Sequence, residues 1–167
     1  MTDPKTESIL DEANRLFLNG KIQDAISYYD KILNTQPDNI SALNNKGYAL
    51  SKLKDYQAAI SCYDKALQNN PNDLPVLINK ISSLRKQKKL DDALSLCNDT
   101  LLNHPNYNIL LYHKERILYS MKRYEESIQC CNEILKDYPL NGDVLFDKAQ
   151  SEAMQSNFDL AIEVLGM

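Results

Sequence analysis

The sequence lacks the features of a membrane-spanning, nucleic-acid-binding or metal-binding protein. No apolar run approaches the roughly 18 residues of a transmembrane helix, so we expect no membrane partner. The net charge is −4, which makes a nucleic-acid partner equally unexpected. The four cysteines form no C-x-x-C pair and only two histidines are present, so we expect no metal site. The cysteines are instead expected to be small, reduced core residues.

Catalytic signatures are missing as well. The chain contains no G-x-S-x-G motif, no glycine-rich phosphate loop, no H-E-x-x-H motif and no dinucleotide-binding fingerprint. We therefore predict that the protein is not an enzyme and has no cofactor. The N-terminal stretch MTDPKTESILDEA is acidic and polar, without the basic and apolar regions of a signal peptide, which favours a cytoplasmic protein.

What the sequence does contain is a repeat. Prolines 37, 71, 105 and 139 follow one another at intervals of 34 residues, and a fixed period of this length is typical of repeat architectures. The period divides the chain into repeats 6–39, 40–73, 74–107 and 108–141, with an incomplete repeat at 142–167. Since neighbouring repeats of this kind bury a continuous core, we expect a single repeat domain, 1–167.

Each repeat shows the pattern of two helices. Apolar residues recur at helical spacing on both sides of a short polar stretch such as SKLKD at 51–55, and two helices of about 13 residues fit. The prolines come just after the second helices, which they would terminate. Asparagine or aspartate then offers a side-chain oxygen as N-cap of the next helix, and these residues are Asp38, Asn39, Asn72, Asp73, Asn106 and Asn141.

Small residues predict close packing between the two helices of a repeat. One register position of the second helices holds Ala25, Ala59, Ala93, Ser127 and Ala161. The matching position of the first helices holds Ala13, Gly47 and Ala149, but Ile81 and Glu115 in the third and fourth repeats. We therefore expect these two repeats to pack differently from the others.

In these respects the sequence resembles the tetratricopeptide repeat family. The resemblance covers about residues 6–167 and is carried by the period and by the set Gly47, Ala59, Tyr63, Ala66 and Pro71. The tryptophan usual near the start of the first helix is replaced by Ile9, Leu43, Leu77, Leu111 and Leu145. The resemblance implies an all-α fold, an α-solenoid of antiparallel helix pairs wound into a right-handed superhelix.

The resemblance also implies a function. Family members bind peptides or proteins without chemistry, and their first helices line a concave groove. We accordingly predict a non-catalytic protein–protein interaction scaffold that binds an extended peptide or protein segment. Register assigns the following residues to the groove: Asn14, Asn44, Asn45, Tyr48, Lys52, Asn79, Ser82, Arg85, Lys86, Tyr112, His113, Arg116 and Tyr119.

The polar groove residues allow two interpretations. Asn45, Asn79 and His113 share one register position, so they either form a ladder for a peptide backbone or are simply solvated. The basic groove residues either attract an acidic segment or, as in RKQKK at 85–89, complement the dipole of a helix end. We do not expect the carboxylate clamp of chaperone adaptors. Its two asparagines are matched by Asn14 and Asn45, but Leu10, Pro75 and Asn79 occupy its basic positions.

The last repeat suggests an alternative function. Leu160 and Val164 lie where earlier repeats contact the next one, so we expect them to be exposed and able to support self-association. The chain would then be an assembly module that uses the solenoid ends, or a fragment of a larger multidomain protein.

Overall fold

The fold is built from paired α-helices. In the computed structural model, residues 4–105 and 107–155 are described, and over these ranges the regular structure consists of helices without strands. The helices are α1 (Pro4–Leu18), α2 (Ile22–Thr35), α3 (Ile40–Lys52), α4 (Tyr56–Asn69), α5 (Leu74–Lys86), α6 (Leu90–Asn103), α7 (Asn108–Ser120), α8 (Tyr124–Asp137) and α9 (Gly142–Met154). The prediction of two helices in each complete repeat is confirmed.

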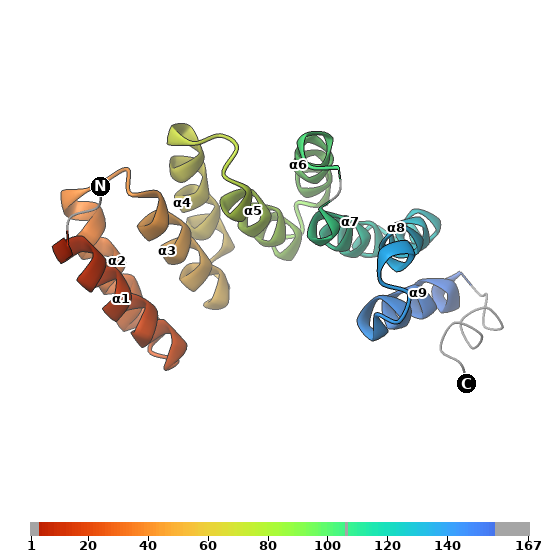
Figure 1. Ribbon diagram of the computed structural model, residues 1–167, viewed down its shortest axis with the longest axis horizontal. Coiled ribbons are helices and arrows are strands. Elements are labelled where there is room, and N and C mark those ends of the chain that lie inside the picture. The colour runs from red at the N-terminus through yellow and green to blue at the C-terminus, as the bar shows by residue number, and fades with distance from the viewer. Residues whose placement is uncertain (1–3, 106, 156–167) are drawn as a thin grey trace. The chain divides into compact units, whose positions relative to one another are not determined.

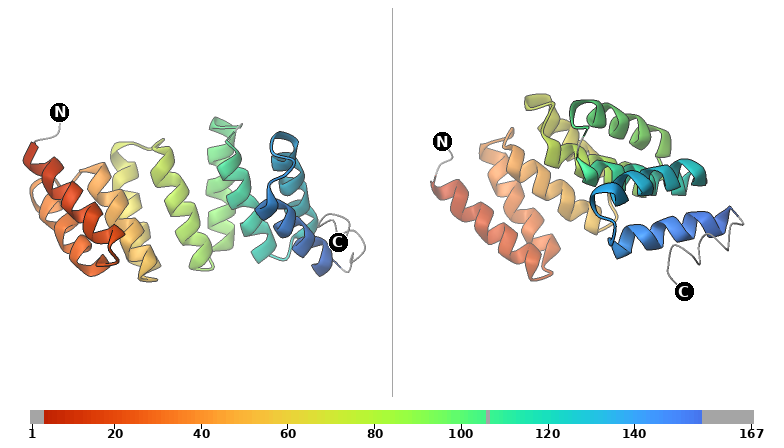
Figure 2. Two further views of the ribbon diagram at one scale, coloured as in Figure 1. Left: turned by 60° about the horizontal axis from the view of Figure 1, so that its bottom comes forward. Right: turned by 45° about the vertical axis from the view of Figure 1, so that its right-hand side comes forward.

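The chain divides into two compact units, residues 1–88 and 89–167. In the first unit each helix from α1 to α5 packs against the next, and α3 also contacts α1 and α5 (Figures 1 and 2). In the second unit α6, α7, α8 and α9 pack in the same sequential way. The division falls inside the third repeat, between α5 and α6. The expectation of a single domain stays a prediction.

The caps of the first helices follow the predicted pattern, with a correction. Asn39, Asp73 and Asn141 each accept a hydrogen bond from a backbone N–H in the first turn of the following helix, at 3.0, 3.2 and 3.3 Å. The prediction that Asp38 and Asn72 also cap is wrong, because each helix begins one residue later. Asn106 lies outside the described residues.

The turn inside each complete repeat has a left-handed residue. Gly20, Lys54, Lys88 and Lys122 have φ angles of 77°, 66°, 68° and 62°, and they recur at the period of the repeat. A residue in this conformation after a helix lets the chain reverse while its N–H groups bond to the last carbonyls. Lys54 N–H, for example, donates to the carbonyl of Ser51 at 3.1 Å.

The close contact between paired helices depends on matched residue sizes. Ala25, Ala59, Ala93 and Ser127 are fully buried, whereas Ala161 lies outside the described residues. In the second repeat, Gly47 faces a tyrosine ring: a Cβ atom at Gly47 would lie 2.5 Å from Cε1 of Tyr63. There is therefore no room for even a methyl group at this position.

In the fourth repeat the sizes are reversed: the larger residue of the contact is on the first helix and the smaller one is on the second helix. Its first helix carries Glu115, which is 2% exposed, and the position that holds Tyr63 in the second repeat holds Cys131. The hydroxyl of Ser127 donates to Oε1 of Glu115 at 2.9 Å, so the buried carboxylate has a polar partner. As expected, this repeat packs differently from the first two.

Candidate functional site

A cavity lies between α1 and α3 in the first unit. Its volume is about 200 Å³, and it is lined by Asn14, Phe17, Leu18, Tyr29, Asn45 and Tyr48. We call it the first-helix cavity, because five of the six residues come from the first helices of two repeats. Three of them, Asn14, Asn45 and Tyr48, belong to the predicted groove. Leu18 and Tyr29 were not predicted to line it, since Leu18 ends its helix and Tyr29 belongs to a second helix.

Asparagine side chains connect the neighbouring first helices beside this cavity. Asn45 Nδ2 donates to Oδ1 of Asn14 at 2.9 Å, and the hydroxyl of Tyr29 donates to the same oxygen at 2.8 Å. Asn79 Nδ2 donates to Oδ1 of Asn44 at 2.9 Å, which links α5 to α3. A primary amide has two N–H donors and an acceptor oxygen. Each donor amide therefore keeps bonding capacity for a ligand after its bond to the next helix.

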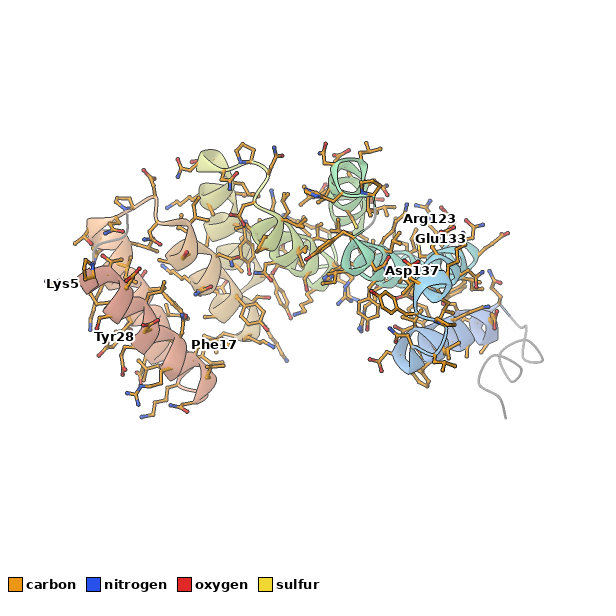
Figure 3. The ribbon with its side chains drawn as sticks, viewed as in Figure 1. Lys5, Phe17, Tyr28, Arg123, Glu133 and Asp137 are labelled. Atoms are coloured by element: carbon orange, nitrogen blue, oxygen red, sulfur yellow. The ribbon has the colours of Figure 1, made fainter. Side chains whose placement is uncertain are left out.

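One wall of the first-helix cavity is aromatic. The ring centroids of Phe17 and Tyr48 are 5.4 Å apart, with the planes inclined at 50°. Figure 3 shows Phe17 on the side of α1 that faces α3. Tyr48 is 39% exposed, and Nζ of Lys52 lies 5.1 Å from the centroid of its ring. An apolar surface and a cation thus lie side by side.

The remaining predicted residues of the first unit lie on α5. Ser82 and Arg85 are half-buried and Lys86 is exposed, the two basic residues being in the last turn of the helix. Lys52 is likewise in the last turn of α3. Positive charge is therefore concentrated at the carboxyl ends of α3 and α5, and the first-helix cavity lies next to Lys52.

The predicted residues of the second unit lie on α7. Arg116 Nη1 donates to the hydroxyl of Tyr112 at 2.9 Å, while its guanidinium carbon lies 5.4 Å from the centroid of that ring. Tyr119 packs edge-on against Tyr124 of the following helix, with centroids 5.5 Å apart. His113 is half-buried. His113 belongs to the second unit, whereas Asn45 and Asn79 belong to the first, and the ladder of these three residues stays a prediction.

A second cavity, of about 350 Å³, lies between α7 and α9. It is lined by Asn108, Ile109, Tyr112, Ile134, Tyr138, Asn141, Asp143 and Val144. We call it the α7–α9 cavity. The side chains of Ile134, Tyr138 and Asn141 belong to α8 and the loop after it, and an argument confined to first-helix register excludes them. The signal that points to Tyr138 is an aromatic residue directly before the repeat's proline.

Acidic groups surround the α7–α9 cavity. Asp143 lines it, and Asp137, at the end of α8 (Figure 3), accepts a hydrogen bond from Asn108 Nδ2 at 3.1 Å. Asp147 follows Asp143 by one helical turn. Burial raises the pKa of Asp147, while the nearby Arg116 lowers it by a smaller amount. Its Oδ2 atom is buried and has no hydrogen-bond partner among the described residues.

The described residues form neither a metal site nor a membrane-spanning helix. In residues 4–105 and 107–155 no group of three histidine, cysteine, aspartate or glutamate side chains could hold a metal ion. No helix in those ranges is long and apolar enough to cross a membrane. The four cysteines are buried and free. Leu160 and Val164, the residues proposed for self-association, lie outside the described residues.

Comparisons with known proteins agree with the fold. A family model described as tetratricopeptide repeat protein 21 N-terminal ARM repeat matches residues 3–128, and a tetratricopeptide repeat model matches residues 116–165. A search of curated proteins found no match.

Solved structures of similar fold are numerous. MamA (41-end) from Desulfovibrio magneticus RS-1 has 19% identity and a TM-score of 0.88, and the match covers 99% of this chain and 94% of that one. A tetratricopeptide repeat protein from Parabacteroides merdae has 17% identity and a TM-score of 0.87, covering 98% and 64%. YrrB, described as a TPR protein with an unusual peptide-binding site, has 18% identity and a TM-score of 0.73, covering 95% and 81%.

The helix pairs, the period and the model that matches residues 3–128 lead to one conclusion: the chain belongs to the tetratricopeptide repeat family, with an all-α solenoid fold of antiparallel helix pairs.

Proposed function

We propose that this chain is a non-catalytic protein-interaction module that binds an extended peptide or protein segment on the face formed by α1, α3 and α5. The observation that carries the proposal is the first-helix cavity, where an aromatic wall meets a row of asparagine amides. YrrB, a protein of similar fold, is described as having an unusual peptide-binding site, which is consistent with this use of the fold.

The size of the cavity favours a side chain over a small molecule. Its volume of about 200 Å³ is below the roughly 300–1,000 Å³ of typical small-molecule sites. An aliphatic or aromatic side chain of the ligand would insert between Phe17 and Tyr48. The amides of Asn45 and Asn79 would then bond to the ligand backbone, whose N–H and C=O groups need both acceptors and donors.

The charge beside the cavity favours an acidic residue in the same segment. Lys52 lies against Tyr48, and Lys86 is exposed at the end of the next first helix. First helices in contact are about 8–10 Å apart, and an extended peptide advances about 3.3 Å per residue. An aspartate or glutamate about three residues from the apolar anchor would therefore reach these cations.

The alternative function is an assembly module that uses the solenoid ends. It depends on Leu160 and Val164, which lie outside the described residues, and it stays a prediction.

Selection of peptides from a random display library, followed by binding of the enriched sequences to the full chain, tests the proposal. We expect an apolar residue and an acidic residue about three positions apart. Tyr48→Ala should weaken binding about tenfold, because it removes the exposed half of the aromatic wall. Leu53→Ala is the matched control, since Leu53 is another exposed apolar residue of this unit but does not line the cavity.

Charge is tested with a second pair of variants. Lys52→Ala should weaken binding and make it less sensitive to salt, whereas Lys65→Ala, which removes an exposed cation from α4, should do neither. If no peptide is enriched, or if Leu53→Ala weakens binding as much as Tyr48→Ala, the proposed site is wrong.

A further inference from the structure

The α7–α9 cavity is independent of the first-helix cavity. All of its lining residues belong to the second unit. Its volume of about 350 Å³ is at the lower end of the roughly 300–1,000 Å³ of small-molecule sites, and it also accommodates a whole side chain. The function proposed for the first unit does not use it.

The walls of this cavity are apolar and accessible. Ile109 is 49% exposed and Tyr138 is 57% exposed, while the buried side chains of Ile134 and Val144 form part of the floor. Large apolar side chains that remain exposed together around a hollow mark a docking surface. A partner side chain that filled the hollow would remove this apolar area from water.

Carboxylates determine the charge preference of the cavity. The amino ends of α7 and α9 and the carboxyl end of α8 all meet here, so the helix dipoles together supply only about half a positive charge, less than the excess of carboxylates. Asp137, Asp143 and Asp147 contribute three negative charges on this face, and Arg116 contributes one positive charge. The guanidinium of Arg116 is already bonded to Tyr112. The net charge around the cavity is therefore negative.

We propose that the α7–α9 cavity is a second docking site, which binds an aliphatic or aromatic side chain flanked by lysine or arginine in a partner protein. The apolar side chain fills the hollow between Ile109 and Tyr138. The flanking cations lie beside Asp143 and Asp137 at its rim, and Asp147, one helical turn after Asp143, adds to the negative charge that attracts them. The two units then select segments of opposite charge.

Labelled synthetic nonapeptides provide the test. One set has a central leucine or phenylalanine flanked by lysines, a second has the same centres flanked by glutamates, and a third has a central alanine flanked by lysines. Binding to the full chain is measured by fluorescence anisotropy, and amide NMR shifts identify the residues affected. We expect the first set to bind at least about tenfold more tightly than the other two, with shifts in α7 and α9.

Variants connect the binding to this cavity. Ile109→Ala should weaken binding of the first set about tenfold, and Asp143→Lys should reverse the preference, so that the glutamate peptides bind better. Leu102→Ala and Asp99→Asn are matched controls on α6, because they remove an exposed apolar group and an exposed carboxylate away from the cavity. Both controls should bind like the wild type.

Several results would overturn the proposal. These are an absence of binding by the first set, equal binding of the lysine and glutamate sets, equal binding of alanine-centred peptides, or equal losses in the variants and their controls. Tyr48→Ala should leave binding at this site unchanged, since Tyr48 belongs to the other unit. A failure here would therefore not affect the function proposed for the first-helix cavity.

Discussion

At the scale of single residues, the left-handed turn position shows a conflict between conformation and residue type. Gly20 adopts its positive φ without steric cost, but Lys54, Lys88 and Lys122 hold the same conformation with a Cβ atom. A left-handed conformation costs an ordinary residue roughly 1–2 kcal/mol. Three repeats therefore carry a small, local strain that the first repeat avoids.

This strain predicts a stabilising substitution. Lys54→Gly should raise the free energy of unfolding by roughly 0.5–1 kcal/mol, because the relief of strain exceeds the entropy that glycine adds to the unfolded chain. Urea unfolding followed by circular dichroism measures the change. Lys65→Gly is the control, since Lys65 lies within α4, where glycine should destabilise by about 1 kcal/mol. Destabilisation by both substitutions would contradict the interpretation.

Gly47 leads to a prediction of the opposite kind. Helix propensity alone would favour Gly47→Ala by about 1 kcal/mol, but the added methyl group would meet the ring of Tyr63 at 2.5 Å. We expect overpacking to dominate and to destabilise the protein by about 1–3 kcal/mol. Gly142→Ala serves as the comparison. Apart from its chain neighbours and the backbone of its own helix, no heavy atom of the described residues lies within 4 Å of a Cβ atom at Gly142. A higher melting temperature for Gly47→Ala would show that the ring can move.

At the scale of helices, the second helices differ in their caps. Asp55 caps α4 by accepting a hydrogen bond from the N–H of Ala58 at 3.1 Å. Lys21 precedes α2 with nearly the same backbone angles, φ −82° and ψ 60° against −83° and 71°, but its side chain makes no capping bond. The backbone at Lys21 is thus suited to a cap that the sequence does not provide.

Removing the cap at Asp55 should lower the free energy of unfolding, and adding a cap at Lys21 should raise it. Asp55→Ala should lower the free energy of unfolding by about 1 kcal/mol, and Lys21→Asp should raise it by a similar or smaller amount. Lys21→Asn separates the cap from the change of charge, because asparagine caps equally well. If both Lys21 variants leave urea unfolding unchanged, the angles at this position do not allow capping.

The helices were predictable from the sequence because their signals are local. Period, prolines and capping residues such as Asn39 and Asp73 act within a few residues, and α3 and α5 begin directly after these two residues. The left-handed turns were harder to predict. They recur at the period of 34, but lysine has no turn preference that would reveal them.

The candidate sites were only partly predictable. Three residues that first-helix register assigns to the groove, Asn14, Asn45 and Tyr48, line one cavity, because residues of one helix face repeat with the fold. That they bind a ligand stays a prediction. The bond of Asn45 to Asn14 depends on how two helices are offset, which a register argument does not include. Tyr138 was missed for a related reason, since a loop residue has no helical register.

At the scale of the whole chain, the proposed single domain predicts cooperative unfolding. Hydrogen exchange in mild urea should give the most protected amides of α3 and α8 the same opening free energy, because neighbouring repeats stabilise one another. A circular dichroism melt should show one transition. Two transitions, with exchange rates that change near residues 88–89, would instead show that the two compact units fold separately.

Because the cysteines are buried, the rate at which they oxidise depends on the stability of the fold. Burial raises the pKa of Cys130 to about 11 and that of Cys97 to about 12, so at neutral pH both remain thiols rather than reactive thiolates. Oxidants can then attack mainly those molecules that have opened. A loss of about 1.4 kcal/mol in opening free energy raises that fraction about tenfold. The shelf life of the protein in air is therefore governed by the packing of its repeats.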